Sequence, residues 1–304
     1  MSSLTARLTD MGYAAGWAAV RHAPDAMARS MFDRVGDLAG RRNGGPDQLR
    51  ANLARVVGTT PEHVPDDLVA AAVRSYARYW YEAFRLPAQD LAATAATVTV
   101  PDADRDRLDD AVAKGRGVVL ALPHTGNWDM AGVWLVQHYG QFATVAERLK
   151  PESLFNRFVA YRESLGFEIF PLSGGEQPPF GLLAQRLRAG GIVCLLGERD
   201  LARHGVPVTF FGERTRMPAG SAQLAIETGA VLLPVHHWFT EAPNSQICCG
   251  TPIDVSEGVG PATQALADAF AANIAAHPQD WHMLQPLWES DWSAERRARI
   301  EEPS

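Results

Sequence analysis

Cysteine and lysine are scarce in this chain of 304 residues. Its three cysteines, Cys194, Cys248 and Cys249, are too few for a disulfide framework, and neighbouring cysteines rarely bridge each other. We therefore expect a reduced, cytosolic protein. Lys114 and Lys150 are the only lysines, so arginine carries almost all of the positive charge. Genomic base composition accounts for most of such a bias, but arginine is also the better bidentate ligand for phosphate.

Long hydrophobic runs are also missing. The longest apolar stretch near the start, residues 11–20, is about half the length that a transmembrane helix requires, and Gly12 and Gly16 interrupt it. No signal peptide is evident. We therefore expect no membrane-spanning helix.

The common strings of metalloproteases, serine hydrolases and nucleotide-binding enzymes are absent. The chain has no H-E-x-x-H, C-x-x-C, G-x-S-x-G or P-loop, and no G-x-G-x-x-G that opens a helix. His236 and His237 resemble a metal-binding pair, but neighbours in a strand point to opposite faces and cannot easily bind one ion. We therefore expect neither a metal nor another cofactor.

The composition is that of a globular protein, with 46% hydrophobic and 21% charged residues. The net charge of −7 argues against a general nucleic-acid-binding protein. The charge is unevenly distributed, because residues 1–55 hold eight Arg and five Asp. That segment therefore has a net charge of +3, and the remainder has −10.

Residues 1–90 are predicted to be helical. Apolar residues recur at helical spacing within 1–58, and residues 66–84 form an amphipathic helix that ends in an aromatic cluster. One interpretation is a helical layer packed on a sheet. The other is a surface that rests in a membrane interface, where Trp, Tyr and Arg are favoured. The two interpretations are compatible.

From about residue 97, strand and helix patterns alternate. The predicted strands are 97–100, 117–122, 141–146, 168–172, 191–196, 206–211, 231–239 and 246–249. The predicted helices are 102–114, 129–139, 153–165, 180–188, 219–228 and 262–277. Such alternation predicts an α/β fold with a central, largely parallel sheet flanked by helices. We expect a single domain over 1–304, in which 95–290 forms the α/β core.

The most informative stretch is the join between an apolar strand and a helix, where His124 and Asp129 lie five residues apart. On one continuous helix these side chains would point about 140° apart. They can meet only if His124 lies in the turn before the helix. Gly126 permits such a turn, and Thr125 or Asn127 can cap the helix.

A histidine in this position is suited to act as a base. The positive end of the helix dipole disfavours its protonation, and a carboxylate on one ring nitrogen leaves the other nitrogen free to take a proton. A base held in this way can activate a hydroxyl group. The alternative is a histidine that only satisfies ordinary polar contacts.

Polar residues follow three of the predicted strands, and they are His124, Glu147 and Glu198. In parallel sheets ligands collect at the carboxyl ends of the strands. If these strands are neighbours, the three side chains converge on one rim of the sheet. Glu198 is therefore a rival to Asp129 as the carboxylate that orients His124.

Further charged residues are candidate ligands for an anionic or polar substrate. Arg162 lies on a predicted helix between two strands, and it can face a phosphate. The loop after Glu198 carries a basic edge, formed by Arg199, Arg203 and His204. Glu227 is the only charge within the apolar stretch 219–230 and can face the groove. For each of these residues the alternative is an ordinary solvated surface charge.

Five blocks carry a resemblance to a known family. The string HTGNWD at 124–129 resembles the H-x4-D motif of glycerolipid and lipid A acyltransferases. The other blocks follow in order: RESLG at 162–166, GERD at 197–200, FFG at 210–212 with PAG at 218–220 and TGA at 228–230, and PQDW at 278–281. The chain thus resembles the bacterial lipid A and lysophospholipid acyltransferase superfamily from about residue 95 to 290. Gram-negative relatives usually begin with a membrane-spanning helix, whereas no such helix is expected here.

Within the superfamily, the length and the wording HTGNWDMAG are most similar to the actinobacterial enzymes that acylate phosphatidylinositol mannosides. This resemblance implies transfer of an acyl group, palmitoyl for the nearest relatives, from acyl-CoA to a mannose hydroxyl. His124 matches the base of the family and Asp129 its partner. Arg162 and Glu198 match positions near the active groove.

The chemistry of acyl transfer agrees with that resemblance. A thioester is already activated, so the reaction needs a base and donors for the developing oxyanion rather than a metal. Backbone N–H groups around Gly126 and Asn127 are candidate donors. Two alternatives remain open: an acyl-CoA or lysophospholipid hydrolase that uses water as the acceptor, and a non-catalytic lipid-binding protein in which His124 is structural.

The acceptor of those relatives is a membrane glycolipid, so the enzyme must meet it at a bilayer surface. The basic segment 1–55 predicts reversible, peripheral binding to anionic lipid on the cytoplasmic leaflet, with Arg7, Arg21 and Arg29 among the contributing charges.

Overall fold

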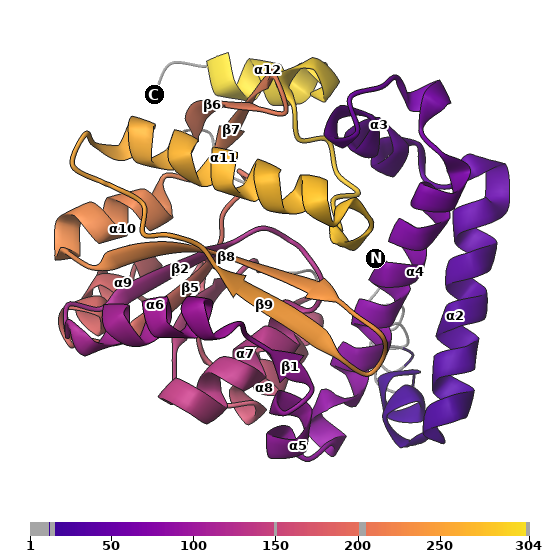
Figure 1. Ribbon diagram of the computed structural model, residues 1–304, viewed down its shortest axis with the longest axis horizontal. Coiled ribbons are helices and arrows are strands. Elements are labelled where there is room, and N and C mark those ends of the chain that lie inside the picture. The colour runs from indigo at the N-terminus through magenta and orange to yellow at the C-terminus, as the bar shows by residue number, and fades with distance from the viewer. Residues whose placement is uncertain (1–11, 13–15, 149–150, 201–204, 302–304) are drawn as a thin grey trace.

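The structure is a computed structural model that describes residues 12, 16–148, 151–200 and 205–301. Figure 1 shows a twisted sheet with helices on both faces and a separate group of N-terminal helices at one end. This is the predicted α/β architecture with an N-terminal helical region.

The main sheet has seven strands in the order β1-β9-β8-β2-β5-β3-β4. Their bounds are β1 (Val98–Thr99), β2 (Val118–Leu122), β3 (Ala143–Ala146), β4 (Glu168–Pro171), β5 (Ile192–Leu196), β8 (Val231–Phe239) and β9 (Ser245–Cys249). Only the β8–β9 pair is antiparallel, so the sheet is largely parallel, as predicted. The continuous apolar runs VVLAL in β2 and IVCLL in β5 fit strands that are covered on both faces.

Each face of the sheet packs against its own set of helices. One set is α6 (Asp102–Ala113), α7 (Trp128–Tyr139) and α8 (Glu152–Ser164), and the other is α9 (Pro179–Arg188), α10 (Gly220–Thr228) and α11 (Val259–Ala276). Val118 and Leu120 of β2 belong to the core on the first side, whereas Val119 and Ala121 belong to the core on the second. The alternation of a strand thus supplies two cores at once.

The N-terminal helices stand together beyond one end of the sheet (Figure 1). They are α2 (Asp25–Arg41), α3 (Asp47–Val56) and α4 (Asp66–Arg85). Arg78 of α4 donates to the backbone oxygen of Thr240, just past the end of β8, at 2.9 Å. Tyr79 donates to Asp129, in the helix that follows β2, at 3.2 Å. The helix α4 therefore closes the end of the sheet at which β2 and β8 finish.

Short elements complete the described chain. They are η1 (Arg42–Gly44), η2 (Pro61–His63), η3 (Leu86–Ala88), α5 (Leu91–Ala95), η4 (Pro278–Asp280), η5 (Glu289–Asp291) and α12 (Ala294–Glu301). Within the described part of the chain, no helix is both long enough and apolar enough to cross a membrane.

One pair of strands differs from the prediction. The strand predicted at 206–211 is β6 (Val206–Phe210), which leaves the main sheet and forms a hairpin with β7 (Glu213–Met217), a strand that we did not predict. The two linking residues, Phe211 and Gly212, both have positive φ angles, of 49° and 78°. Such a two-residue turn matches the twist of a hairpin. The strand β7 was not predicted because its sequence, ERTRM, is mostly polar and lacks an apolar run.

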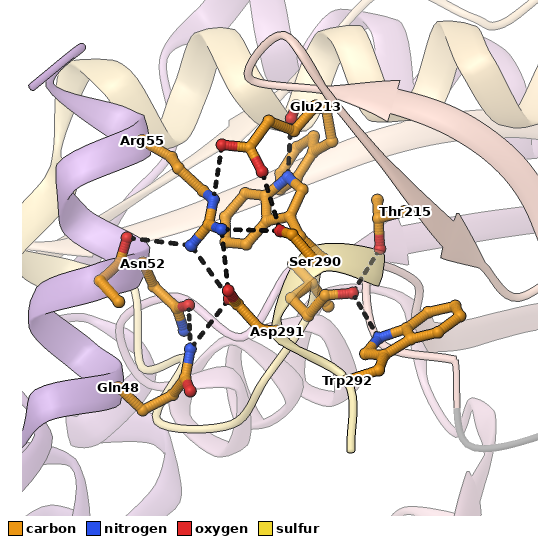
Figure 2. A network of polar contacts seen from close by, with 12 residues as sticks. Gln48, Asn52, Arg55, Glu213, Thr215, Ser290, Asp291 and Trp292 are labelled. Atoms are coloured by element: carbon orange, nitrogen blue, oxygen red, sulfur yellow. Dashed lines mark hydrogen bonds and ion pairs between the residues drawn. The ribbon is translucent and has the colours of Figure 1, made fainter. Parts of the chain in front are cut away.

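Arg55, at the end of α3, ties the N-terminal helices to two distant segments (Figure 2). Its guanidinium donates to Glu213 Oε1 of β7 at 2.9 Å and to both carboxylate oxygens of Asp291, each at 2.9 Å. Asn52, one helical turn earlier, donates to backbone oxygens of the segment 283–285 at 2.7 and 3.0 Å. These contacts hold the C-terminal segment against α3.

Candidate active site

Residues 123–127 form the turn between β2 and α7, the His124 turn. Asn127 is the N-cap of α7, because its side-chain oxygen accepts the N–H groups of Asp129 and Met130, both at 3.1 Å. His124 therefore precedes the helix and Asp129 lies in its first turn, as the sequence predicted. The cap satisfies two of the N–H groups that a helix N-terminus leaves without partners.

Gly126 lets the His124 turn lie directly against β8. Its φ is +54°, and a Cβ at this position would lie 2.2 Å from Nδ1 of His237 and 2.6 Å from its carbonyl oxygen. Any other residue would meet both the strained backbone and the collision. This glycine thus fixes how closely the turn approaches the neighbouring strand.

His124 pairs with Glu198. The residues Leu122 and Leu196 are partners in the β2–β5 ladder, and each of the two side chains lies two residues farther on. Glu198 Oε1 lies 2.8 Å from His124 Nδ1 and accepts the His124 backbone N–H at 2.5 Å. Glu198 is fully buried, whereas 22% of the His124 side chain is exposed. The structure thus places one carboxylate on one nitrogen of a partly accessible imidazole.

The electrostatics of this pair favour an ionised carboxylate. Burial alone raises the pKa of Glu198, but the attraction of the His124 ring and the hydrogen bonds from His124 outweigh it, so the pKa lies below its ordinary value. Trp281 Nε1 adds a longer contact to the same oxygen at 3.4 Å. Glu198 is therefore arranged as a permanent hydrogen-bond acceptor for the ring.

Asp129 takes a different partner. Its Oδ1 accepts a hydrogen bond from Arg162 Nε at 2.8 Å, and its Oδ2 accepts one from the Tyr79 hydroxyl at 3.2 Å. Burial disfavours the Arg162 cation, but the Asp129 charge outweighs this effect and raises the pKa of Arg162. Of the two rival carboxylates, the structure thus brings Glu198, not Asp129, to the ring of His124.

The backbone N–H groups that we considered as oxyanion donors are already in use. Gly126 donates to the carbonyl oxygen of Asp280 at 2.8 Å. Asn127 donates to Nδ1 of His237, also at 2.8 Å. Because each N–H carries one proton, neither group can serve an oxyanion in this conformation. Asn127 is itself fully buried, and its side chain caps α7 rather than facing a substrate.

A cavity of about 360 Å³ opens beside His124, and its lining also includes Asp129, Glu147 and Arg162. One part lies between α7 and the sheet and is apolar; among its residues are Leu120, Ala131, Gly132, Leu135, Phe167 and Val235. Another part is lined by Arg199 and by Gly220 and Ser221 at the start of α10. The cavity thus extends from the space beneath α7 to the N-terminus of α10.

The remaining predicted residues have mixed outcomes. Glu147 is exposed and Arg199 is half-buried, and both line the cavity. Glu227 does not line the cavity; it is exposed on α10 and accepts a hydrogen bond from Gln223 at 3.0 Å, so it is a surface charge. His204, like Arg203, lies outside the residues that the structure describes.

Comparison of the sequence with known proteins shows the family of this chain. A profile of the bacterial lipid A biosynthesis acyltransferase family matches residues 2–290. The chain belongs to this family. It is 61% identical to the phosphatidylinositol mannoside acyltransferase of Mycolicibacterium smegmatis over 298 residues, which are 98% of this chain and 97% of the relative. It is 57% identical to the protein of the same name in Mycobacterium tuberculosis over 300 residues, 98% of this chain and 94% of the relative.

Three of the sequence blocks that carried the resemblance converge on the block 124–129 in this lipid A acyltransferase family member. The block 162–166 supplies Arg162, and the block 197–200 supplies Glu198. The block 278–281 pairs with the turn, because Thr125 and Trp281 form an antiparallel bridge. Segments that are far apart in the sequence thus form one continuous site.

The helix α4 contributes polar residues that we had not assigned to the site. Besides Tyr79, Glu82 accepts a hydrogen bond from Nδ2 of Asn127 at 2.9 Å. Burial raises the pKa of Glu82 despite its ion pair with Arg78. Ser75 donates to Asp280 Oδ1 at 2.5 Å. A signal was present in the sequence, since Ser75, Tyr79 and Glu82 recur at helical spacing on one side of an otherwise apolar stripe.

The raised pKa of Asp280 should make the unfolding free energy depend on pH. Burial raises the pKa of this carboxyl to about 6, above the value of about 3.9 in an unfolded chain. The folded state therefore binds the proton more tightly, and stability gains as pH falls from about 7 to about 4. Over that window, the unfolding free energy of the wild type should rise relative to that of Asp280→Asn by about 1–3 kcal/mol in urea titrations. A difference that stays constant with pH would contradict this assignment.

Proposed function

We propose that this protein transfers a long-chain acyl group, palmitoyl in the first instance, from acyl-CoA to a mannose hydroxyl of a phosphatidylinositol mannoside. The observation that carries the proposal is the His124–Glu198 pair beside a cavity lined largely by apolar side chains. The name of the relatives at 57% and 61% identity supports the acceptor. We further propose that the whole chain acts as one acyltransferase domain.

In the proposed reaction His124 is the general base. Glu198 accepts a hydrogen bond from the protonated Nδ1 of His124. The other ring nitrogen, Nε2, therefore takes the proton of the acceptor hydroxyl. The oxygen then attacks the thioester carbonyl and forms a tetrahedral intermediate. When the carbon–sulfur bond breaks, His124 returns the proton to the departing thiolate of CoA, and an ester remains on the sugar. Glu198 stabilises the imidazolium that exists between the two proton transfers.

The charge that develops on the thioester oxygen needs a donor other than the His124 turn. Arg162 is the best candidate, because it lines the same cavity as His124 and carries a permanent positive charge. Asp129 and Tyr79 hold this part of the wall in place. Asp129 then acts through Arg162, and we assign it to orientation rather than to proton transfer.

The two parts of the cavity suit the two parts of the donor. Apolar side chains around Gly132 fit the acyl chain, since burial of each CH₂ group contributes about 0.8 kcal/mol. Gly132 has no room for a side chain, because a Cβ would lie 2.4 Å from the Phe167 ring. Arg199 and the N-terminus of α10 at Gly220 and Ser221 offer donors to the phosphates of CoA. Glu147 and His204 remain candidates for contacts with the acceptor.

One assay separates this proposal from its alternatives. The protein is mixed with palmitoyl-CoA, with and without a phosphatidylinositol mannoside, and free CoA, free palmitate and acylated lipid are measured. Acyl transfer predicts acylated lipid and acceptor-dependent release of CoA. Palmitate release that does not depend on the acceptor indicates a hydrolase. Binding of palmitoyl-CoA without turnover under either condition indicates a lipid-binding protein.

We also propose that α2 meets the cytoplasmic leaflet of the membrane. Four large apolar side chains lie exposed along one face of this helix, and their exposed fractions run from 47% to 71%: Met27, Met31, Val35 and Leu38. Exposed cations lie beside this stripe, namely Arg34, Arg41 and Arg42. An apolar stripe flanked by arginine is typical of a helix that lies in a membrane interface.

Of the arginines first considered for membrane binding, Arg7 lies outside the described residues, Arg21 is half-buried, and Arg29 is exposed on α2 and stays a candidate. Arg34, Arg41 and Arg42 form the set for the test because they lie beside the apolar stripe. Reversal of Arg34, Arg41 and Arg42 to Glu should weaken flotation with anionic liposomes by more than tenfold, because each Arg contributes roughly 1 kcal/mol near such a surface. Binding should also weaken with salt, since exposed charge is screened.

The matched control reverses three exposed cations at the other end of the sheet, Lys114, Arg116 and Arg188. These residues precede the amino ends of β2 and β5. If both triple variants lose binding equally, attraction depends on overall charge and α2 has no special role. The α2 variant should retain turnover on a detergent-solubilised acceptor.

A further inference from the structure

The double histidine of β8 flanks the His124 turn. In the ladder, Ala121 of β2 pairs with Pro234, so β8 runs on past the end of β2 to Phe239. The His124 turn lies beside this extension, where His236 and His237 are found. Both histidines are 1% exposed, and neither takes part in the proposed chemistry.

His237 contacts the turn from the α7 side of the sheet. It shares this face with Val235, which packs in the core beneath α7. Its Nδ1 accepts the backbone N–H of Asn127 at 2.8 Å, and the hydrogen of Gly126 occupies the space beside the same ring. An acceptor at Nδ1 places the ring proton on Nε2. The ring thus accepts the hydrogen bond of one backbone N–H of the turn, as a capping side chain does at a helix end.

His236 contacts the same turn from the opposite face. Its Nδ1 lies 3.1 Å from the hydroxyl of Thr125, and its ring stacks at 5.9 Å from that of His277, just past the end of α11. Neighbouring residues in a strand point to opposite faces, which prevents joint binding of one metal ion. The same geometry allows the two rings to contact the His124 turn from both faces of the sheet.

We propose that His237 is a positioning residue for His124, which it holds in place through the backbone of Asn127, and that His236 supports the turn from the other face. Backbone N–H groups of the His124 turn are fixed to Glu198, two residues past the end of β5, to Asp280 on the C-terminal segment, and to His237 on β8. The carbonyl oxygen of His124 also accepts the N–H of His282 at 2.8 Å. On this proposal, loss of the His237 contact lets the turn shift and displaces the imidazole. The effect on rate rests on the proposed function, whereas the effect on the order of the turn does not.

Two other roles for His237 fit the structure less well. Burial lowers its pKa to about 3, so the ring is neutral at physiological pH and supplies no proton. Apolar packing alone would not account for the acceptor at Nδ1, which meets a backbone N–H that otherwise has no partner at the helix N-terminus. The chemical group that matters is therefore an acceptor at the δ position.

The test compares two amide substitutions. In His237→Asn the side-chain oxygen can occupy the place of Nδ1, whereas in His237→Gln the amide lies one bond farther out, where Nε2 was. Both variants are neutral and polar. We expect His237→Asn to keep kcat within a few-fold of wild type and His237→Gln to lose about 10²-fold, with KM for acyl-CoA unchanged, because a misplacement of about 1 Å costs this much. His138→Gln, at the far end of α7, is the matched control and should change neither quantity.

Hydrogen exchange of the Asn127 amide provides a readout that does not need turnover. In His237→Gln this amide should exchange about fivefold faster than in wild type, because one hydrogen bond is worth about 1 kcal/mol. In His237→Asn the rate should stay close to that of wild type. Equal exchange rates in the two variants, or equal losses of kcat, would overturn the positioning role and leave His237 as core packing. If the wild type shows no acyl transfer, the proposed function fails, and the exchange comparison still decides the role of His237.

Discussion

His124→Ala is expected to lower the rate of acyl transfer by about 10²–10⁴-fold and to leave the fold and acyl-CoA binding intact. The imidazole is the one partly exposed titratable group that Glu198 holds at the wall of the cavity. Removal of the ring leaves the acceptor hydroxyl without a base. The backbone N–H of His124, which also anchors the turn to Glu198, is retained in the variant.

Initial rates with palmitoyl-CoA and a phosphatidylinositol mannoside measure this effect, with circular dichroism as the check on folding. His138→Ala is the matched control, because His138 lies on α7, the helix that follows the His124 turn, and does not line the cavity. A well-folded His124→Ala with nearly full activity would remove the general base from the proposed mechanism. A drop in acyl-CoA binding together with rate would assign His124 to the donor site instead.

The order of elements could be predicted because it depends on local patterns. The apolar run 117–122, the turn and the helix after it are properties of adjacent residues, and they place His124 correctly before α7. Glu198 could be reached by one more step, because parallel strands that end in polar residues bring those residues to one edge. Strand register alone therefore brings His124 and Glu198 to this edge, and this is why the sequence could predict it.

The partners of Asp129, Gly126 and Asn127 could not be predicted in this way. Asp129 lies 33 residues from Arg162 and 50 from Tyr79, and such contacts depend on how whole helices pack rather than on local spacing. The backbone N–H groups of the turn were expected to be free for an oxyanion, since neither Asp280 nor His237 has a local signal that aims it at them. Loops acquire such partners only from the tertiary structure.

The role of the N-terminal helices shows the same limit. Amphipathicity identified 66–84 as a helix with one apolar side, but this pattern does not say which surface it covers. In the structure α4 reaches the site with Tyr79 and Glu82, and α2 packs on α4 and leaves Met27 and Leu38 exposed. The packing layer is thus α4, and the membrane surface that we propose is a different helix, α2.

The second large effect is expected for Glu198→Gln. The amide oxygen can still accept the backbone N–H of His124, so the turn should keep its place. The variant lacks the negative charge that stabilises the imidazolium during proton transfer, and the transfer rate should fall roughly 10³–10⁴-fold, as for orienting carboxylates of catalytic triads.

Asp129→Asn is the matched comparison, and it should act through a different quantity. It leaves the Arg162 cation, whose side chain is 18% exposed, facing a neutral amide, and breaking an ion pair with a buried carboxylate costs up to about 3–5 kcal/mol of unfolding free energy. We therefore expect a large loss of stability in Asp129→Asn and a modest one in Glu198→Gln. Among folded protein, the transfer rate should fall less in Asp129→Asn than in Glu198→Gln, because Asp129 acts on the reaction only through Arg162. If Asp129→Asn loses the larger share of the rate and Glu198→Gln stays nearly fully active, Asp129 is the carboxylate that orients His124 during the reaction, and the contact with Glu198 is structural.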